Sequence, residues 1–200
     1  MSNIVLKIDS SARLQGSLSR QVTQYIAQQL MADNVIHRDV GKTNPELITE
    51  AHIGAYFTKA GDRTDEQKQL LSQSDELIKE LHAASQLIIG APMYNFSVPA
   101  ALKAWIDLVC RVGETFVYGD SGPEGLVGID RAFIVVTAGG TPLGSEVDFS
   151  SAYLQQICRF IGIRHIHIID VSGSKRDPST LIDFAKKQVD DILLTSSSEQ

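Results

Sequence analysis

Residues 85–109 read SQLIIGAPMYNFSVPAALKAWIDLV, and this stretch contains the unit that decides the fold. The segment 85–90 has the continuous apolar character of a strand that is covered on both faces. Pro99 stands where a first helical turn would begin, and helical spacing continues past Trp105 and Leu108. A buried strand followed by a helix is the repeating unit of a parallel sheet.

The same alternation extends in both directions from this unit. Apolar runs predict four further strands, at residues 3–9, 35–40, 132–136 and 164–171. Spacing predicts helices at 19–34, 64–84 and 178–194, one around Leu154 and a short one within 45–57, whereas 119–128 is rich in turn residues. The pattern therefore predicts an α/β fold, with residues 1–200 forming one domain around a five-stranded parallel sheet that has helices on both faces. Ligands of such sheets bind beyond the carboxyl ends of the strands, which directs attention to three loops.

The first loop, residues 9–19, reads DSSARLQGSLS and leads directly into a helix. Hydroxyl groups of Ser11, Ser17 and Ser19, loop N–H groups and the positive end of the helix dipole can together hold a phosphate dianion. Ser17 or Ser19 can equally be a plain helix N-cap that needs no ligand, so this loop alone leaves both interpretations open. It matches neither the Walker pattern nor G-x-G-x-x-G, which weakens ATP and direct dinucleotide binding.

The second loop contains Met93, Tyr94, Asn95 and Phe96 between a strand and a helix. Aromatic and thioether side chains in such a loop favour packing against something flat, and an isoalloxazine ring is such a partner. The amide of Asn95 can both donate and accept hydrogen bonds at the polar edge of that ring. The third loop, 137–140, reads TAGG, where glycines let the backbone approach a ligand closely. Ordinary turn chemistry explains the glycines equally well, but not the Met-Tyr-Asn-Phe run.

Charge and composition exclude several kinds of partner. The formal net charge is −6 and no Lys/Arg-rich run exists, which argues against nucleic acid and against an anionic membrane surface. No apolar run approaches the length of a membrane span, and no signal peptide is expected. Cys110 and Cys158 lie in no Cys-x-x-Cys motif and are predicted to be buried free thiols, so we expect a cytoplasmic protein.

The three loops together resemble a known family. Ser11 with the run 17–19, the Pro-Met-Tyr-Asn-Phe run at 92–96 and the run 137–140 look like the FMN-binding segments of the bacterial FMN-dependent NADH-azoreductases, which are also described as NADH:quinone oxidoreductases. Residues 115–118 (TFVY) and 122–126 (GPEGL) are similar to a further aromatic and glycine-rich loop of that family. The likeness runs through nearly the whole chain in the same order, and Met-Tyr-Asn-Phe is its most specific part.

The resemblance implies a flavodoxin-like fold, tightly bound FMN and a cytoplasmic homodimer with its active sites at the subunit interface. It implies electron transfer from NADH or NADPH to quinones and azo compounds in a ping-pong mechanism, with no catalytic side chain and no metal. Tyr118 and Phe160 would bind substrate over the flavin. The implied FMN-binding residues are Ser11, Ser17, Leu18, Ser19, Met93, Tyr94, Asn95, Phe96, Thr137, Ala138, Gly139 and Gly140.

Two departures from the family pattern and one rival function remain open. Thr137-Ala138 replaces the Ser-Arg often found before the paired glycines, and Arg13 lies in the phosphate loop, so the nucleotide and acceptor preferences are not fixed. His165 and His167 are two apart on a strand and face the same way, but the sequence gives them no third metal ligand. The rival is a flavodoxin-type electron carrier that serves protein partners and turns over no small substrate.

Overall fold

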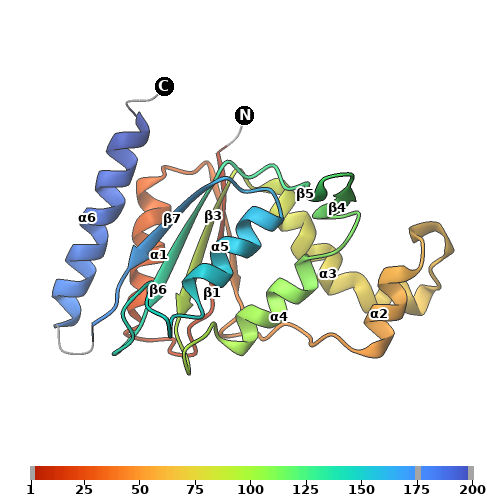
Figure 1. The fold of residues 1–200 in the computed structure, drawn as a ribbon, viewed down its shortest axis with the longest axis horizontal. Coiled ribbons are helices and arrows are strands. Elements are labelled where there is room, and N and C mark those ends of the chain that lie inside the picture. Colours follow the sequence, from red (N-terminus) through yellow and green to blue (C-terminus); the bar gives the residue numbers. More distant parts are fainter. Residues whose placement is uncertain (1–2, 174–176, 198–200) are drawn as a thin grey trace.

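The computed structural model describes residues 3–173 and 177–197, so residues 1–2, 174–176 and 198–200 of the predicted domain lie outside the described residues. Its centre is a parallel sheet with the strand order β2-β1-β3-β6-β7 (Figure 1). The strands are β1 Ile4–Asp9, β2 Asn34–Asp39, β3 Gln86–Pro92, β6 Arg131–Thr137 and β7 His165–Asp170. The predicted five-stranded parallel sheet is confirmed.

Helices cover both faces of the sheet, as the sequence pattern predicts (Figure 1). One face packs against α1 and α6, through a core that contains Val22, Phe133 and Val189. The other face packs against α3, α4 and α5, around the buried side chain of Trp105. The helices are α1 Leu18–Gln29, α2 Glu50–Phe57, α3 Asp65–Ala83, α4 Ala100–Val109, α5 Ser151–Phe160 and α6 Pro178–Ser197.

Two predicted helix boundaries are wrong, and one segment predicted as turns contains a strand. The helix predicted for 19–34 ends at Gln29, because Met31 takes a positive φ of 47° and the chain turns into β2 at Asn34. The short helix within 45–57 begins only at Glu50, where Thr49 and His52 form a capping box. The turn-rich segment 119–128 contributes to an antiparallel ribbon of β4 (Phe116–Gly119) and β5 (Gly122–Gly125).

The strand order reverses direction between β1 and β3, which are adjacent in the middle of the sheet. A crevice therefore opens beyond the carboxyl ends of these two strands, where ligands of such sheets bind. Hydrogen bonds tie the loops together there: Met93 N donates to Thr137 O at 2.8 Å, and Ala12 N donates to Tyr94 Oη at 3.2 Å. All three predicted loops thus meet at one edge of the sheet.

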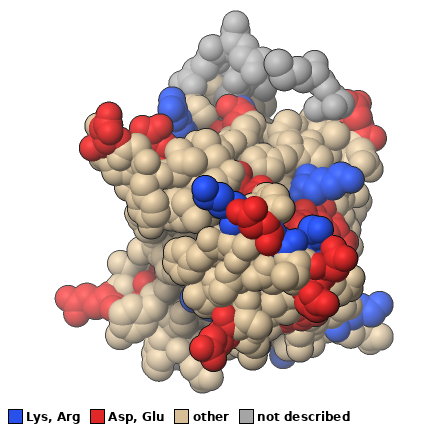
Figure 2. Space-filling view, turned by 90° about the vertical axis from the view of Figure 1, so that its right-hand side faces the viewer, with Lys and Arg blue, Asp and Glu red and all other residues tan. Residues whose placement is uncertain are grey.

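On the molecular surface, acidic and basic side chains are interspersed on the face shown in Figure 2. This mixed pattern differs from the continuous basic face that nucleic acid would favour. Within the described residues, none of the helices is both long and apolar enough to span a lipid bilayer.

Candidate functional site

The loop after β1 presents hydroxyl and N–H groups at the amino end of α1. Ser17 is the N-cap of α1, and its Oγ lies at the long distance of 3.5 Å from Arg20 N. The same Oγ lies 3.1 Å from Ser19 Oγ, and Ser11 Oγ accepts from Arg13 N at 3.2 Å. Because the cap bond is long, the Ser17 hydroxyl is only weakly held by the helix. The arrangement is suited to an anion that would complete these hydrogen bonds.

The loop after β3 is a tight two-residue turn with unusual backbone geometry. Tyr94 and Ser97 exchange main-chain hydrogen bonds of 2.9 and 3.1 Å across it. The central residues, Asn95 and Phe96, have positive φ values of 51° and 71°. Asparagine tolerates this region, but a bulky aromatic residue adopts it only under strain. Such strain clusters at ligand sites, and Phe96 is 53% exposed in this turn.

A cavity of about 490 Å³ lies between the three loops. This volume is within the range of small-molecule and cofactor sites. The cavity brings together eight predicted site residues: Ser11, Ser17, Leu18, Met93, Tyr94, Thr137, Ala138 and Gly139. It also contains residues that were not predicted, which are Pro92 and, from the chain after β7, Val171, Gly173, Pro178 and Leu181. Among the described residues that line this cavity, Arg13 has the only charged side chain.

A second cavity, of about 630 Å³, adjoins the first and shares Tyr94 with it. Its lining comprises Tyr94, Asn95, Ser97, Val98, Ala100, Lys103, Phe149 and Tyr153. Phe149 is tied to the strained turn, because its N–H donates to Phe96 O at 3.1 Å. Burial, and then the charge of Asp107, raises the pKa of Tyr153 to about 12, so its phenol stays protonated. The site therefore offers room for two molecules side by side.

Comparison with known proteins identifies the family. The profile of a family described as having a flavodoxin-like fold matches residues 3–193. FMN-dependent NADH:quinone oxidoreductase 1 of Hahella chejuensis is 46% identical over 189 residues, covering 92% of each chain. Its namesake from Colwellia psychrerythraea is 47% identical over 189 residues, which cover 93% of this chain and 98% of the other. The chain belongs to the FMN-dependent NADH:quinone oxidoreductases.

A solved structure supports the fold of this oxidoreductase. The FMN-dependent NADH-azoreductase of Bacillus anthracis, determined in complex with FMN, superposes with a TM-score of 0.82 over 95% of this chain and 97% of the other. The sequence identity is 23%, so this likeness concerns the fold alone.

The remaining predicted residues lie outside the first cavity. Ser19 is buried with its hydroxyl next to that of Ser17, while Asn95 lines the second cavity and Phe96 and Gly140 are exposed. Tyr118 and Phe160 lie at the other end of the sheet, where both contact Phe116. The ring centroid of Phe116 is 5.5 Å from that of Tyr118 and 4.3 Å from that of Phe160. The ribbon that carries Tyr118 lies against the turn between α5 and β7, where Gly125 approaches Gly162 closely. One oxidoreductase chain by itself therefore does not bring Tyr118 and Phe160 to the cavity.

Both cysteines and His167 lie outside the linings of the two cavities. Cys110 and Cys158 are free, and burial raises the pKa of each thiol to about 12, which makes them unreactive. His167 stacks on Phe133, and burial followed by the charge of Arg131 lowers its pKa. Within the described residues, no three His, Cys, Asp or Glu side chains converge as a metal site would require.

Asp148 holds the segment that carries Phe149 into the second cavity. Its carboxylate accepts hydrogen bonds from Gly144 N at 2.8 Å, from Ser150 N and Ser151 N at 3.0 Å each, and from Ser151 Oγ at 2.5 Å. Burial alone would raise the pKa of Asp148, but these hydrogen bonds, led by that from the Ser151 hydroxyl, lower it overall. The ionised form is therefore the one that the fold stabilises.

Asp148→Asn is expected to lower the free energy of unfolding by about 1–2 kcal/mol at pH 7, because the charge-assisted hydrogen bonds are lost. A lowered folded-state pKa means that this stabilisation is complete above the unfolded carboxyl pKa of about 4 and is lost as the pH falls below it. Urea unfolding at pH 7 and below pH 4 measures the difference. Asp65→Asn, at an exposed side chain in the first turn of α3, is the control. An equal effect of both substitutions, or an Asp148 effect that does not shrink in acid, would contradict the assignment.

Proposed function

We propose that this chain binds FMN in the 490 Å³ cavity and uses it to pass electrons from NADH or NADPH to quinones, and also to azo compounds. One observation carries the proposal. The cavity joins a serine-lined helix N-terminus to a wall of Pro92, Met93 and Tyr94. A terminal phosphate and a flat ring are what such a pair of surfaces would recognise. The names of the relatives, and the FMN complex of the B. anthracis azoreductase, support the same cofactor.

The residues present fit FMN in their donor chemistry. Ser11, Ser17 and the N–H groups at the start of α1 would hold the phosphate, and no acidic residue in the first turn of α1 would repel it. Met93 and Tyr94 would contact the ring, and Gly139 would let the loop after β6 approach it without a Cβ. We assign the adjoining cavity to the nicotinamide and the electron acceptor, which leaves no place among the described residues for the adenine of FAD. We therefore expect FMN to bind more tightly than FAD.

When bound, FMN supplies reversible two-electron chemistry that the side chains lack. The protein's own contribution is to bind and orient the molecules and to stabilise charge. Asn95 and nearby N–H groups would donate hydrogen bonds to negative charge at the polar edge of the ring. Phe149 and Tyr153 would exclude water from the second cavity, where the nicotinamide and then the electron acceptor would bind. An azo compound would need two such cycles to give two amines, whereas a quinone needs one.

Sharing one cavity predicts ping-pong kinetics, because the oxidised nicotinamide must leave before the acceptor enters. Double-reciprocal plots of the initial rate against NADH concentration should be parallel at several menadione concentrations. Lines that intersect, in the absence of substrate inhibition, would show that both substrates are bound at once and would contradict the shared cavity. No NADH oxidation with menadione or methyl red would instead favour a flavodoxin-type carrier.

We also propose a homodimer in which Tyr118 and Phe160 of one protomer line the cavity of its partner. Support comes from Tyr118, which is 73% exposed, and from the distance of both residues from the cavity of their own chain. Light scattering should give twice the mass of one chain, and Tyr118→Ala should raise the KM for the quinone without changing FMN affinity. A monomeric mass with full activity would contradict this arrangement.

The two cysteines support a proposal about the cellular compartment. Cys110 and Cys158 are both unpaired in the structure. Free buried thiols are usual in reducing compartments, and we therefore propose a cytoplasmic location.

A further inference from the structure

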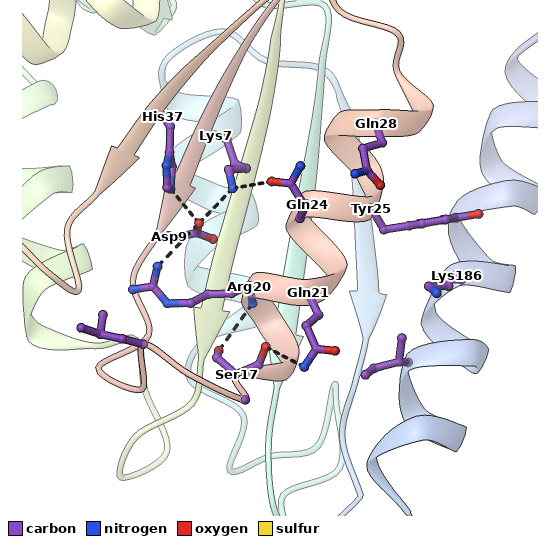
Figure 3. A pocket seen from close by; sticks show the side chains of 13 residues that line it. Lys7, Asp9, Ser17, Arg20, Gln21, Gln24, Tyr25, Gln28, His37 and Lys186 are labelled. Atoms are coloured by element: carbon purple, nitrogen blue, oxygen red, sulfur yellow. Dashed lines mark hydrogen bonds and ion pairs between the residues drawn. The ribbon is translucent and has the colours of Figure 1, made fainter.

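A group of charged side chains lies behind the phosphate loop, on the face of the sheet that α1 covers (Figure 3). Asp9, at the end of β1, is only 2% exposed. Its carboxylate accepts from Thr23 Oγ1 at 2.8 Å and lies 2.8 Å from His37 Nε2, 3.2 Å from Lys7 Nζ and 3.8 Å from Arg20 Nη1. None of these groups faces the 490 Å³ cavity, so the proposed chemistry does not use them.

Arg20 connects this group to the phosphate loop. Two of its nitrogens bind Asp39 of β2 in a bidentate pair, with distances of 2.6 and 2.7 Å. The same guanidinium donates to Ser11 O at 2.8 Å and to Arg13 O at 3.1 Å. One side chain therefore fixes two carbonyl groups of the loop to the neighbouring strand. The planar, multidentate geometry of arginine is what makes four such bonds possible.

The charges that surround Arg20 keep this connection intact. The hydrogen bond to Asp39 raises the pKa of Arg20. Burial alone would raise the pKa of Asp39, but the hydrogen bond and charge of Arg20 lower it overall. Asp39 is itself held, because its Oδ1 accepts from Lys42 N at 3.0 Å.

The position of Arg20 is not one that helix stability would favour. It lies in the first turn of α1, three residues after the N-cap Ser17, where a positive charge opposes the helix dipole. Within the described part of the chain, Ala12 N and Arg13 N have no main-chain acceptor: they donate to the hydroxyls of Tyr94 and Ser11, both of which line the cavity. Holding the carbonyls on one side leaves these N–H groups on the cavity side.

We propose that Arg20 is a positioning residue for the flavin phosphate. It holds the main chain of residues 11–13 in the phosphate-binding shape through Ser11 O and Arg13 O, with Asp39 and Asp9 as its anchors, and it does not itself contact the cofactor. The inference rests on the proposed function, since it concerns how the same cavity recognises FMN. It predicts that Arg20 contributes to affinity for the phosphate group and not for the ring.

The test compares FMN with riboflavin, which has the same ring and no phosphate. Arg20→Lys keeps the positive charge but cannot make the four bonds. It should raise the Kd for FMN about tenfold, roughly 1.4 kcal/mol, and leave the Kd for riboflavin unchanged in fluorescence titrations. Arg38→Lys is the matched control, because Arg38 lies next to Asp39 on β2 and is likewise held by two carboxylates, Glu76 and Glu80 of α3. Neither Kd should change in the control.

Asp39→Asn is a second variant, which keeps Arg20 but weakens its bidentate pair with residue 39. It replaces Arg20→Lys in the test if that variant does not fold. This variant should also raise the Kd for FMN and leave the Kd for riboflavin unchanged. Unchanged FMN affinity in a folded variant, or equal losses for both flavins, would overturn the role of Arg20. If the unmodified protein binds FMN no more tightly than riboflavin, the phosphate site of the proposed function is wrong, and this inference is wrong with it.

Discussion

Ser17→Asp is expected to weaken FMN binding about a hundredfold while the protein stays folded. The new carboxylate would lie beside a phosphate that carries about −1.5 to −2 charges at neutral pH. Like charges about 4 Å apart repel by roughly 4 kcal/mol per unit pair at an effective dielectric near 20. If screening and movement relieve half of the total, about 3 kcal/mol remains, which is roughly a hundredfold in Kd.

Stability should not fall, because aspartate is as good an N-cap as serine and favours the same helix dipole. Thr64→Asp is the matched control: Thr64 is the N-cap of α3 and accepts from Gln67 N at 3.2 Å, away from the cavity. It should leave flavin affinity unchanged. A Ser17→Asp protein with near-normal FMN affinity would show that Ser17 is only a helix cap and that the phosphate lies elsewhere.

Gly41→Ala is expected to destabilise the protein by about 3 kcal/mol and to weaken FMN binding as well. Gly41 follows β2 and donates to Asp9 O at 3.1 Å. A Cβ at this position would lie 2.4 Å from Ser11 O and 2.8 Å from Ser11 C, so the phosphate loop itself would have to move. Urea unfolding and FMN titration measure the two effects.

The control for this substitution is Gly54→Ala in α2, where a Cβ would meet nothing within 4 Å. Alanine favours the helix, so the control should gain up to about 1 kcal/mol and bind FMN normally. If Gly41→Ala behaves like the control, the loop is more adaptable than the structure implies, and rigid positioning of residues 11–13 is not needed for flavin binding.

The fold could be predicted from the sequence because its strands are buried runs separated by helices with clear spacing. Strands β3 and β6 show this well, since their continuous apolar character follows from helices on both faces. The end of α1 could not be predicted, because the left-handed turn at Met31 has no glycine or asparagine to mark it. The β4–β5 ribbon could not be predicted because β5 (GPEG) is rich in glycine and gives a turn signal, although β4 (FVYG) contains three good β-formers.

The loops of the site were predictable because each contains residues that are unusual in plain turns. The Met-Tyr-Asn-Phe run and the serines before α1 gave that signal. The cavity wall formed by Val171, Gly173 and Leu181 could not be predicted, because in the sequence these residues look like an ordinary strand end and helix start. Arg20 of α1 and Asp39 of β2 are 19 residues apart, and their pairing depends on the packing of α1 against β1, the strand that neighbours β2 in the sheet.

The most direct test of the account is a two-step absorbance measurement on the FMN-loaded protein without oxygen. We expect one equivalent of NADH to bleach the yellow flavin absorbance and one equivalent of menadione, added afterwards, to restore it. Full recovery after both steps would support a cavity that serves donor and acceptor in turn. A flavin that NADH does not bleach, or that menadione does not restore once bleached, would contradict the proposed NADH:quinone oxidoreductase activity.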